Sequence, residues 1–279
     1  MSAPAQATVR TAGLAVVVAL AIVYVVWGST YLAIRLALEG GWPPLMGVSG
    51  TRFVLAGGVM YAVLRWRGVA VPSAAQWRNL AVMGALLLGL GNGWVVLAQQ
   101  HVSSGLAAIA VASMPLWMGV FGMLAGLRPS RVEWLGIAIG FAGVLWLNAG
   151  SSLTASPFGL VMLLLAPVAW AYGSIWSRGR DLPSPFMTAA AQMLCGGVLL
   201  VAMGLLRGES FAAMPTLRGS LAVLYLAVFR SIIAISAFVW LLHHVRPALV
   251  SSYAYVNPVI AVALGAWLAG ERFSGHDLG

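Results

Sequence analysis

The sequence predicts an all-α integral membrane protein, built as a polytopic bundle of two inverted five-helix repeats. Two features of composition point to this fold class: 61% of the 279 residues are hydrophobic, and only 8% are charged. A soluble domain carries about 25% charged residues, and much of its surface must face water. We therefore expect the lipid bilayer to surround this chain. A helix needs about 20 apolar residues to cross it.

Nine apolar stretches follow one another along the chain and predict nine membrane spans. They cover residues 14–34, 46–64, 80–98, 105–126, 132–148, 158–176, 187–206, 219–242 and 248–269. The strands of a transmembrane barrel would alternate apolar and polar residues. Stretches such as Leu80–Leu90 and Val259–Ala269 are apolar all round, so the pattern favours helices.

The basic residues predict how the chain is oriented. All fifteen are arginines, and the formal net charge is +9. In a soluble protein this charge would suggest nucleic acid; here the arginines cluster in short loops, and we predict no nucleic-acid partner. Nine of them are expected in the loops on one side of the membrane: Arg10, Arg65, Arg67, Arg78, Arg128, Arg131, Arg178, Arg180 and Arg246. Four are expected on the other side: Arg35, Arg207, Arg218 and Arg272. Because positive loops stay inside, we expect a cytoplasmic N-terminus.

An internal repeat underlies the predicted architecture. The segment Leu106–Gly136 aligns with Leu249–Gly279 without gaps, and Pro115 falls on Pro258. Five spans in the first half would make the two repeats point in opposite directions, an arrangement that places a transporter's substrate site between them. We therefore divide the chain into a first repeat at 1–150, with five spans, and a second at 151–279, with four. By this alignment a tenth helix is expected and missing.

Several motifs carry a family resemblance along nearly the whole chain. They are Trp27–Tyr31 (WGSTY), Trp42–Pro44 (WPP), Arg52–Phe53, Gly91–Gly93 (GNG), Glu133–Gly140, Tyr253–Pro258 (YAYVNP) and Gly270–Glu271. In these motifs the chain resembles EamA-type proteins of the drug/metabolite transporter superfamily, in their YedA-like branch. The resemblance implies ten helices, a bacterial inner membrane, and export of amino acids or other small metabolites. Where the family pattern has glycine, this chain has Arg230.

We expect a substrate cavity near the two symmetric prolines. Proline removes a helical hydrogen bond, and broken helices form transporter sites near the membrane midplane. A simple packing kink is the alternative. Polar Asn residues could contact substrate or join helices, and the aromatic residues could line the cavity or form an interfacial belt. The predicted cavity residues are Trp27, Tyr31, Asn92, Trp94, Met114, Pro115, Trp170, Arg230, Tyr253, Asn257 and Pro258.

Two arginines within the apolar stretches carry separate expectations. Arg52 is expected at the outer start of the second span, where its side chain can snorkel to the interface. Arg230 lies in the middle of the eighth span, where an arginine costs about 2.5–3.5 kcal/mol on insertion scales. It either faces the cavity and binds a substrate carboxylate, or it is a damaging replacement of glycine. Glu133 lies at the start of the fifth predicted span, and no Asp or Glu falls deeper within a predicted span, which argues against a buried-carboxylate proton relay.

Other classes of function have weaker support in the sequence. Gly47–Gly50 (GVSG) matches the serine motif of an intramembrane protease, with His101 as a candidate base. A structural subunit of a membrane complex is a third class. The chain lacks the HExxH and Walker A motifs and paired carboxylates, so we predict no enzyme, no metal and no cofactor. The GxxxG at Gly136 and Gly140 fits close helix packing or a homodimer.

Overall fold

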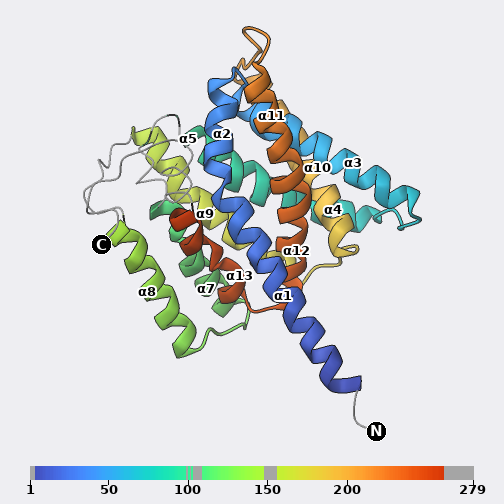
Figure 1. Ribbon diagram of the computed structural model, residues 1–279, viewed down its shortest axis with the longest axis vertical. Helices are drawn as coiled ribbons and strands as arrows, with labels where there is room; N and C mark the ends of the chain where they lie inside the picture. Colours follow the sequence, from blue (N-terminus) through green and yellow to red (C-terminus); the bar gives the residue numbers. More distant parts are fainter. Residues whose placement is uncertain (1–3, 99, 101, 103–108, 148–155, 261–279) are drawn as a thin grey trace.

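The computed structural model describes residues 4–98, 100, 102, 109–147 and 156–260, and every long element among them is a helix (Figure 1). Six helical runs are long and apolar enough to cross a membrane. They are Gly13–Glu39, Pro44–Trp66, Ala74–Ala98, Pro157–Ser177, Pro185–Leu206 and Leu217–His244. They correspond to the first, second, third, sixth, seventh and eighth predicted spans. The predicted all-helical membrane fold is therefore confirmed.

Most of these runs join two or three helical segments end to end. In chain order the segments are α1 (Pro4–Gly28), α2 (Thr30–Glu39), η1 (Pro44–Thr51), α3 (Arg52–Trp66), α4 (Ala74–Met83), η2 (Gly84–Gly93), α5 (Trp94–Ala98), α9 (Pro157–Ser177), α10 (Pro185–Leu206), α11 (Leu217–Tyr225), η3 (Leu226–Ala234) and α12 (Ile235–His244). Segments η1, η2 and η3 are π-helical.

The other three predicted spans lie partly outside the described residues. The fourth appears as an apolar helix at Ile109–Leu124, which contains α7 (Met114–Leu124). The fifth is α8 (Arg131–Leu147), with 17 residues. The ninth begins with α13 (Pro247–Ser251) and continues as helix over residues 253–260. The number of spans, the division into repeats and the missing tenth helix therefore stay predictions.

Two of the π-helical segments contain the polar residues that lie in the middle of predicted spans. Such helical turns are rare and occur frequently at functional sites. Asn92 belongs to η2, and Arg230 belongs to η3. The helices that lead into these segments begin in the same way, because the side chains of Ser73 and Thr216 accept backbone N–H groups at the starts of α4 and α11. Each cap satisfies a donor that a helix start leaves free.

Helix α10 packs against α3, η1, η2, α4 and α12. Small residues allow these close approaches. A Cβ added at Gly57 of α3 would lie 2.7 Å from the Ala190 carbonyl oxygen, and one at Gly84 would lie 2.6 Å from that of Gln192. These glycines therefore fix how closely α3 and η2 approach α10.

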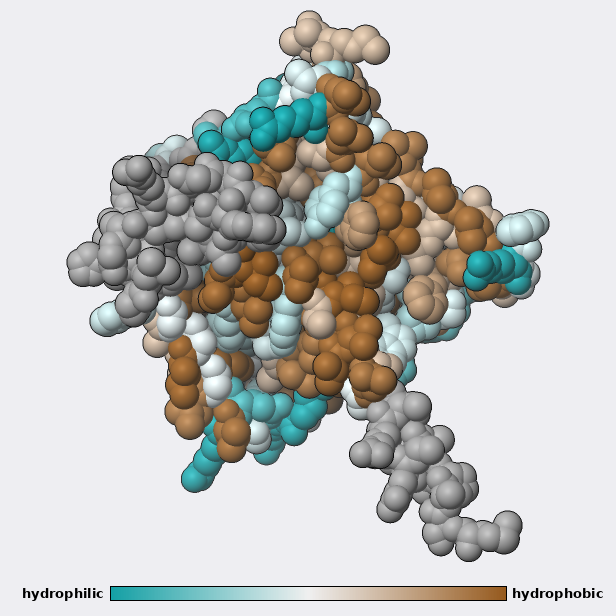
Figure 2. Space-filling model, viewed as in Figure 1, coloured by the Kyte–Doolittle hydropathy of each residue, from teal (hydrophilic) through white to brown (hydrophobic). Residues whose placement is uncertain are grey.

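Apolar side chains cover the middle of the visible face of the molecule (Figure 2). Hydrophilic residues gather toward its upper and lower ends. On α8 the exposed apolar side chains include Val132, Leu135, Ile139 and Trp146. This band of exposed apolar surface suits the hydrocarbon core of a bilayer.

Candidate functional site

A cavity lies inside the bundle, between helices from both halves of the chain. It is reached by residues of α1, α2, η2, α5, α7, α9 and η3, and by the helices around residues 111 and 253–260. Its lining residues are Trp27, Thr30, Ile34, Gly91, Asn92, Val95, Val96, Val111, Met114, Ala166, Pro167, Trp170, Arg230, Tyr253 and Asn257. Most of this lining is apolar, with a few polar groups, as in small-molecule sites generally.

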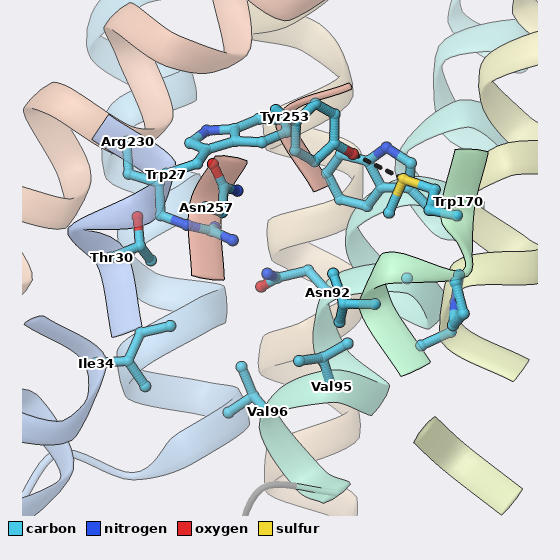
Figure 3. Close-up of a pocket in the computed structure, with 15 residues that line it drawn as sticks. Trp27, Thr30, Ile34, Asn92, Val95, Val96, Trp170, Arg230, Tyr253 and Asn257 are labelled. Carbon is cyan, nitrogen blue, oxygen red and sulfur yellow. Dashed lines mark hydrogen bonds between the residues drawn. The ribbon is translucent and has the colours of Figure 1, made fainter. Parts of the chain in front are cut away.

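Aromatic rings close one end of the cavity. Figure 3 shows Trp27, Tyr253 and Trp170 side by side at this end, with Ile34 and Val96 toward the other. The Trp27 ring centroid lies 4.6 Å from that of Tyr253 and 5.7 Å from that of Trp170, both edge-to-face. Phe238 packs behind them, 5.2 Å from Trp27. We call these four rings the aromatic cluster. All four are buried, so they form a packed wall at this end of the cavity.

Polar side chains from opposite walls face each other below the aromatic cluster. Arg230 extends from the wall that carries Trp27 and Thr30, and the Asn92 amide extends from the opposite wall (Figure 3). The Asn257 side-chain amide is oriented so that its nitrogen faces two backbone acceptors. In this orientation the nitrogen donates to the carbonyl oxygens of Tyr24 at 3.2 Å and of Tyr253 at 3.1 Å. Asn257 therefore joins α1 to the helix 253–260, the interhelical role that its position in an apolar stretch also predicts.

Three lining residues carry buried polar atoms that have no hydrogen-bond partner within the described part of the chain. They are the indole nitrogens of Trp27 and Trp170 and the Oδ1 atom of Asn92. A buried polar atom without a partner costs about 1–3 kcal/mol. A ligand or water that enters the cavity and bonds to Asn92 would recover this cost. The cavity can thus recognise hydrogen-bonding groups as well as an apolar body.

The structure brings most of the predicted cavity residues together. Seven of the eleven line the cavity: Trp27, Asn92, Met114, Trp170, Arg230, Tyr253 and Asn257. Pro115 and Pro258 are buried directly beside the lining residues Met114 and Asn257. Trp94 is half-buried against the core and lies outside the lining. The backbone of Tyr31 lies in α2, and its side chain falls outside the described residues.

Helical spacing connects most of the remaining lining residues to the predicted ones. Thr30 follows Trp27 by three positions, and Val95 and Val96 follow Asn92 by three and four. Residues at these spacings share one face of a helix. Val111, Ala166 and Pro167 precede Met114 and Trp170 in the same way, so this spacing could have identified them from the sequence. Phe238 lies behind the cavity, and no predicted cavity residue lies three or four positions from it in the sequence.

The expectation for Arg52 is wrong. The second span begins at Pro44, eight residues before Arg52, which therefore lies inside the helical run and is 0% exposed. None of its three guanidinium nitrogens has a hydrogen-bond partner in the described residues. Its guanidinium carbon lies 4.3 Å from the Phe53 ring centroid. Snorkelling needs a path to the interface, and packing of α3 against α10 and η3 leaves none.

The described residues hold no arrangement typical of a hydrolase or a metal site. Ser49 of the GVSG motif is fully buried in η1, and its Oγ has no hydrogen-bond partner there. Its candidate base, His101, lies outside the described residues. No cluster of three or more His, Cys, Asp or Glu side chains suited to a metal occurs in the described part of the chain.

A membrane-spanning helix bundle with a polar and aromatic cavity at its centre has the features of a small-molecule transporter. Residues 14–149 and 157–278 match the EamA-like transporter family. The chain belongs to this family, within the drug/metabolite transporter superfamily.

Relatives and a solved structure agree with this assignment. The chain is 46% identical to the "Uncharacterized inner membrane transporter YedA" of Escherichia coli (strain K12), over 92% of this chain and 83% of the relative. It is 25% identical to the "Probable amino-acid metabolite efflux pump" of Salmonella typhimurium, over 92% and 88%. A solved structure described as "Crystal structure of protein" shares the fold, with a TM-score of 0.78 and 21% identity over 96% of this chain and 92% of that one.

Proposed function

We propose that this transporter exports amino acids or other small metabolites across the bacterial inner membrane. The observation that carries the proposal is the cavity, in which aromatic faces, Asn92 and Arg230 converge inside the membrane-spanning bundle. A similar protein named as a probable amino-acid metabolite efflux pump supports the same substrate class. The function fits a secondary carrier or a facilitator.

The proposed mechanism is alternating access, with the aromatic cluster as the barrier on one side. A solute bound in the cavity can leave past the cluster only when Trp27 separates from Tyr253 and Trp170. Helix 109–124 offers a place for movement, because it is interrupted at Ser113 before Pro115. Rocking of the two halves about a central site is the common motion of transporters with inverted repeats.

We also propose that the N-terminus lies in the cytoplasm. On the side predicted to be cytoplasmic, two arginines form hydrogen bonds or an ion pair that connect neighbouring helix ends. Arg178 donates to the carbonyl oxygens of Leu242 and Val245, at the end of α12. Arg246 pairs with Glu133 at 2.7 Å and donates to the Arg128 carbonyl oxygen. Partial burial lowers the pKa of Arg178 from its ordinary value. Labelling of single cysteines placed beside Arg67 and Arg207 in intact cells would test this orientation.

Efflux from proteoliposomes tests the transport proposal. Vesicles are loaded with pooled amino acids and metabolites, and the solutes lost over time are identified. We expect saturable loss of a restricted set of solutes, weakened by Tyr253→Ala and by Asn257→Ala. Tyr172→Ala is the matched control, since this tyrosine is 45% exposed on α9, outside the cavity lining. Loss of no solute from folded protein would overturn the proposal.

A further inference from the structure

A second cavity lies at the end of the bundle where α7, α8 and α13 come together, at the lower end of the view in Figure 1. Its volume is about 290 Å³, and it shares no lining residue with the cavity that contains Asn92. Its charged lining residues are Arg128, Glu133, Arg178 and Arg246. All three arginines belong to the set that is expected on the cytoplasmic side of the membrane, so this cavity lies at the membrane interface.

Neighbouring elements hold two of these arginines in place. Arg178 uses one guanidinium nitrogen, Nη1, to bind two backbone carbonyl oxygens at and just after the end of α12. Arg246 uses Nε to pair with Glu133 at 2.7 Å and Nη2 to bind the Arg128 carbonyl oxygen at 2.8 Å. Because these contacts already order the side chains, a ligand that binds them loses less entropy on binding.

The donors of this cavity suit an anion that has several oxygens. Both oxygens of Glu133 are engaged, Oε1 by Arg246 and Oε2 by the backbone N–H of Ser130 at 2.6 Å. Each guanidinium group carries five N–H donors, so the three arginines have more donors than these contacts use. The planar fork of a guanidinium matches two oxygens of a phosphate group. A phosphate is therefore the ligand chemistry that this lining favours.

An exposed apolar surface leads away from this cavity along α8. Leu127 lines the cavity, and Val132, at the start of α8, is 78% exposed. Leu135 and Ile139 follow Val132 at spacings of three and then four residues and are also exposed. Residues at these spacings share one face of a helix. This face suits the acyl chains of a lipid whose head group lies at the cavity.

From this arrangement we propose that the second cavity binds the phosphate group of an anionic phospholipid. The phosphate oxygens accept hydrogen bonds from Arg128 and Arg178, and the acyl chains follow the exposed face of α8. Basic pockets between transmembrane helices on the cytoplasmic side bind the head groups of anionic lipids. Free phosphate has the same oxygens but makes no use of the apolar face, which is why we favour the lipid. The inference goes beyond the proposed transport function and does not depend on which solute is carried.

Native mass spectrometry of the purified full chain, stripped of lipid in detergent, measures the binding. Phosphatidylglycerol (anionic) and phosphatidylcholine (zwitterionic) with the same acyl chains are titrated separately, and inorganic phosphate is then added in excess. We expect phosphatidylglycerol to bind at least about tenfold more tightly than phosphatidylcholine and to stay bound when phosphate is added. Equal binding of the two lipids would overturn the inference. Displacement of the lipid by inorganic phosphate would identify a site for soluble phosphate instead and would also overturn it.

Substitutions locate the lipid on the protein. Arg128→Gln should weaken phosphatidylglycerol binding by about fivefold, and the addition of Arg178→Gln should bring the loss to about 25-fold. Because Arg178 also anchors the end of α12, the exposed Arg128 provides the variant that leaves the fold intact. Arg67→Gln is the matched control, an exposed arginine on the same predicted side but outside this cavity, and its effect should stay within about twofold because salt screens distant charges. Unchanged binding in Arg128→Gln, or an equal loss in Arg67→Gln, would overturn a site at this cavity.

Discussion

The start of the second span depends on one carboxylate from a distant part of the chain. Glu209 follows α10, and its oxygens accept the backbone N–H groups of Leu45, at 3.0 Å, and of Met46, at 2.7 Å. These donors belong to the first turn of η1, where a helix offers them no internal acceptor. Glu209 thus acts as a helix cap supplied from another loop, and its charge also suits the positive end of the helix dipole.

The cost of removing this cap can be worked out from these contacts. Glu209→Ala loses two charge-assisted hydrogen bonds, which contribute about 1.5–3 kcal/mol each when buried. The site is half-buried, so water replaces part of this, and the loss of a helix cap costs about 0.5–2 kcal/mol. We expect Glu209→Ala to lower the free energy of unfolding by about 2 kcal/mol. Glu209→Gln, which keeps one acceptor oxygen, should lose about half as much.

Unfolding by SDS in mixed micelles, followed by circular dichroism, measures this change. Glu39→Ala is the matched control, because this carboxylate makes an exposed i,i+4 pair with Arg35, worth about 0.2–0.5 kcal/mol. If Glu209→Ala and Glu39→Ala shift the unfolding midpoint equally, the inferred capping role is wrong. If Glu209→Gln lowers the free energy of unfolding as much as Glu209→Ala does, the strength of the cap depends on its geometry or charge more than on the number of acceptor oxygens.

Two further predictions concern α8 and the residues that contact it, and they can be measured in the same assay. Gly140→Ala should destabilise by about 1–3 kcal/mol through overpacking, because its Cβ would lie 2.4 Å from the Tyr255 ring. Gly136→Ala, with open space around it, should be neutral or stabilise by up to about 1 kcal/mol; a homodimer at this GxxxG would reverse that result. Arg246→Gln should cost about 1 kcal/mol or less, since the Arg246 side chain is 60% exposed, although that of its partner Glu133 is only 19% exposed. The cost should shrink in high salt.

The membrane fold could be predicted from hydropathy, but the ends of the helices could not. The third span was expected at 80–98 and begins at Ala74. Its first turns carry Gln76 and Arg78, which hydropathy excludes, and the cap at Ser73 makes this polar turn helical. The first span was expected to end at residue 34 and continues to Glu39. In each case local hydrogen bonds or ion pairs, which an apolar count does not register, extend the helix.

The sequence predicts only part of the cavity lining. Aromatic and amide side chains in apolar stretches identified its main contributors, and positions three or four residues away complete each helix face. Trp94 shows the limit of that approach. It lies only two residues from Asn92, and residues two apart point to different sides of a helix. An aromatic side chain in an apolar stretch therefore does not by itself line the cavity.

Arg52, at the start of α3, and Arg230, in η3, come near each other only through the packing of α3 against η3, which hydropathy does not predict. One substitution separates the two interpretations of Arg230. Arg230→Gly removes a mid-span cost of about 2.5–3.5 kcal/mol and adds about 1 kcal/mol for glycine in a helix. Both interpretations therefore predict about 2 kcal/mol of added stability in the SDS assay. Only the binding interpretation predicts that the same change abolishes saturable efflux from proteoliposomes. A more stable Arg230→Gly variant that still transports its solutes as well as the unchanged chain would identify Arg230 as a damaging substitution.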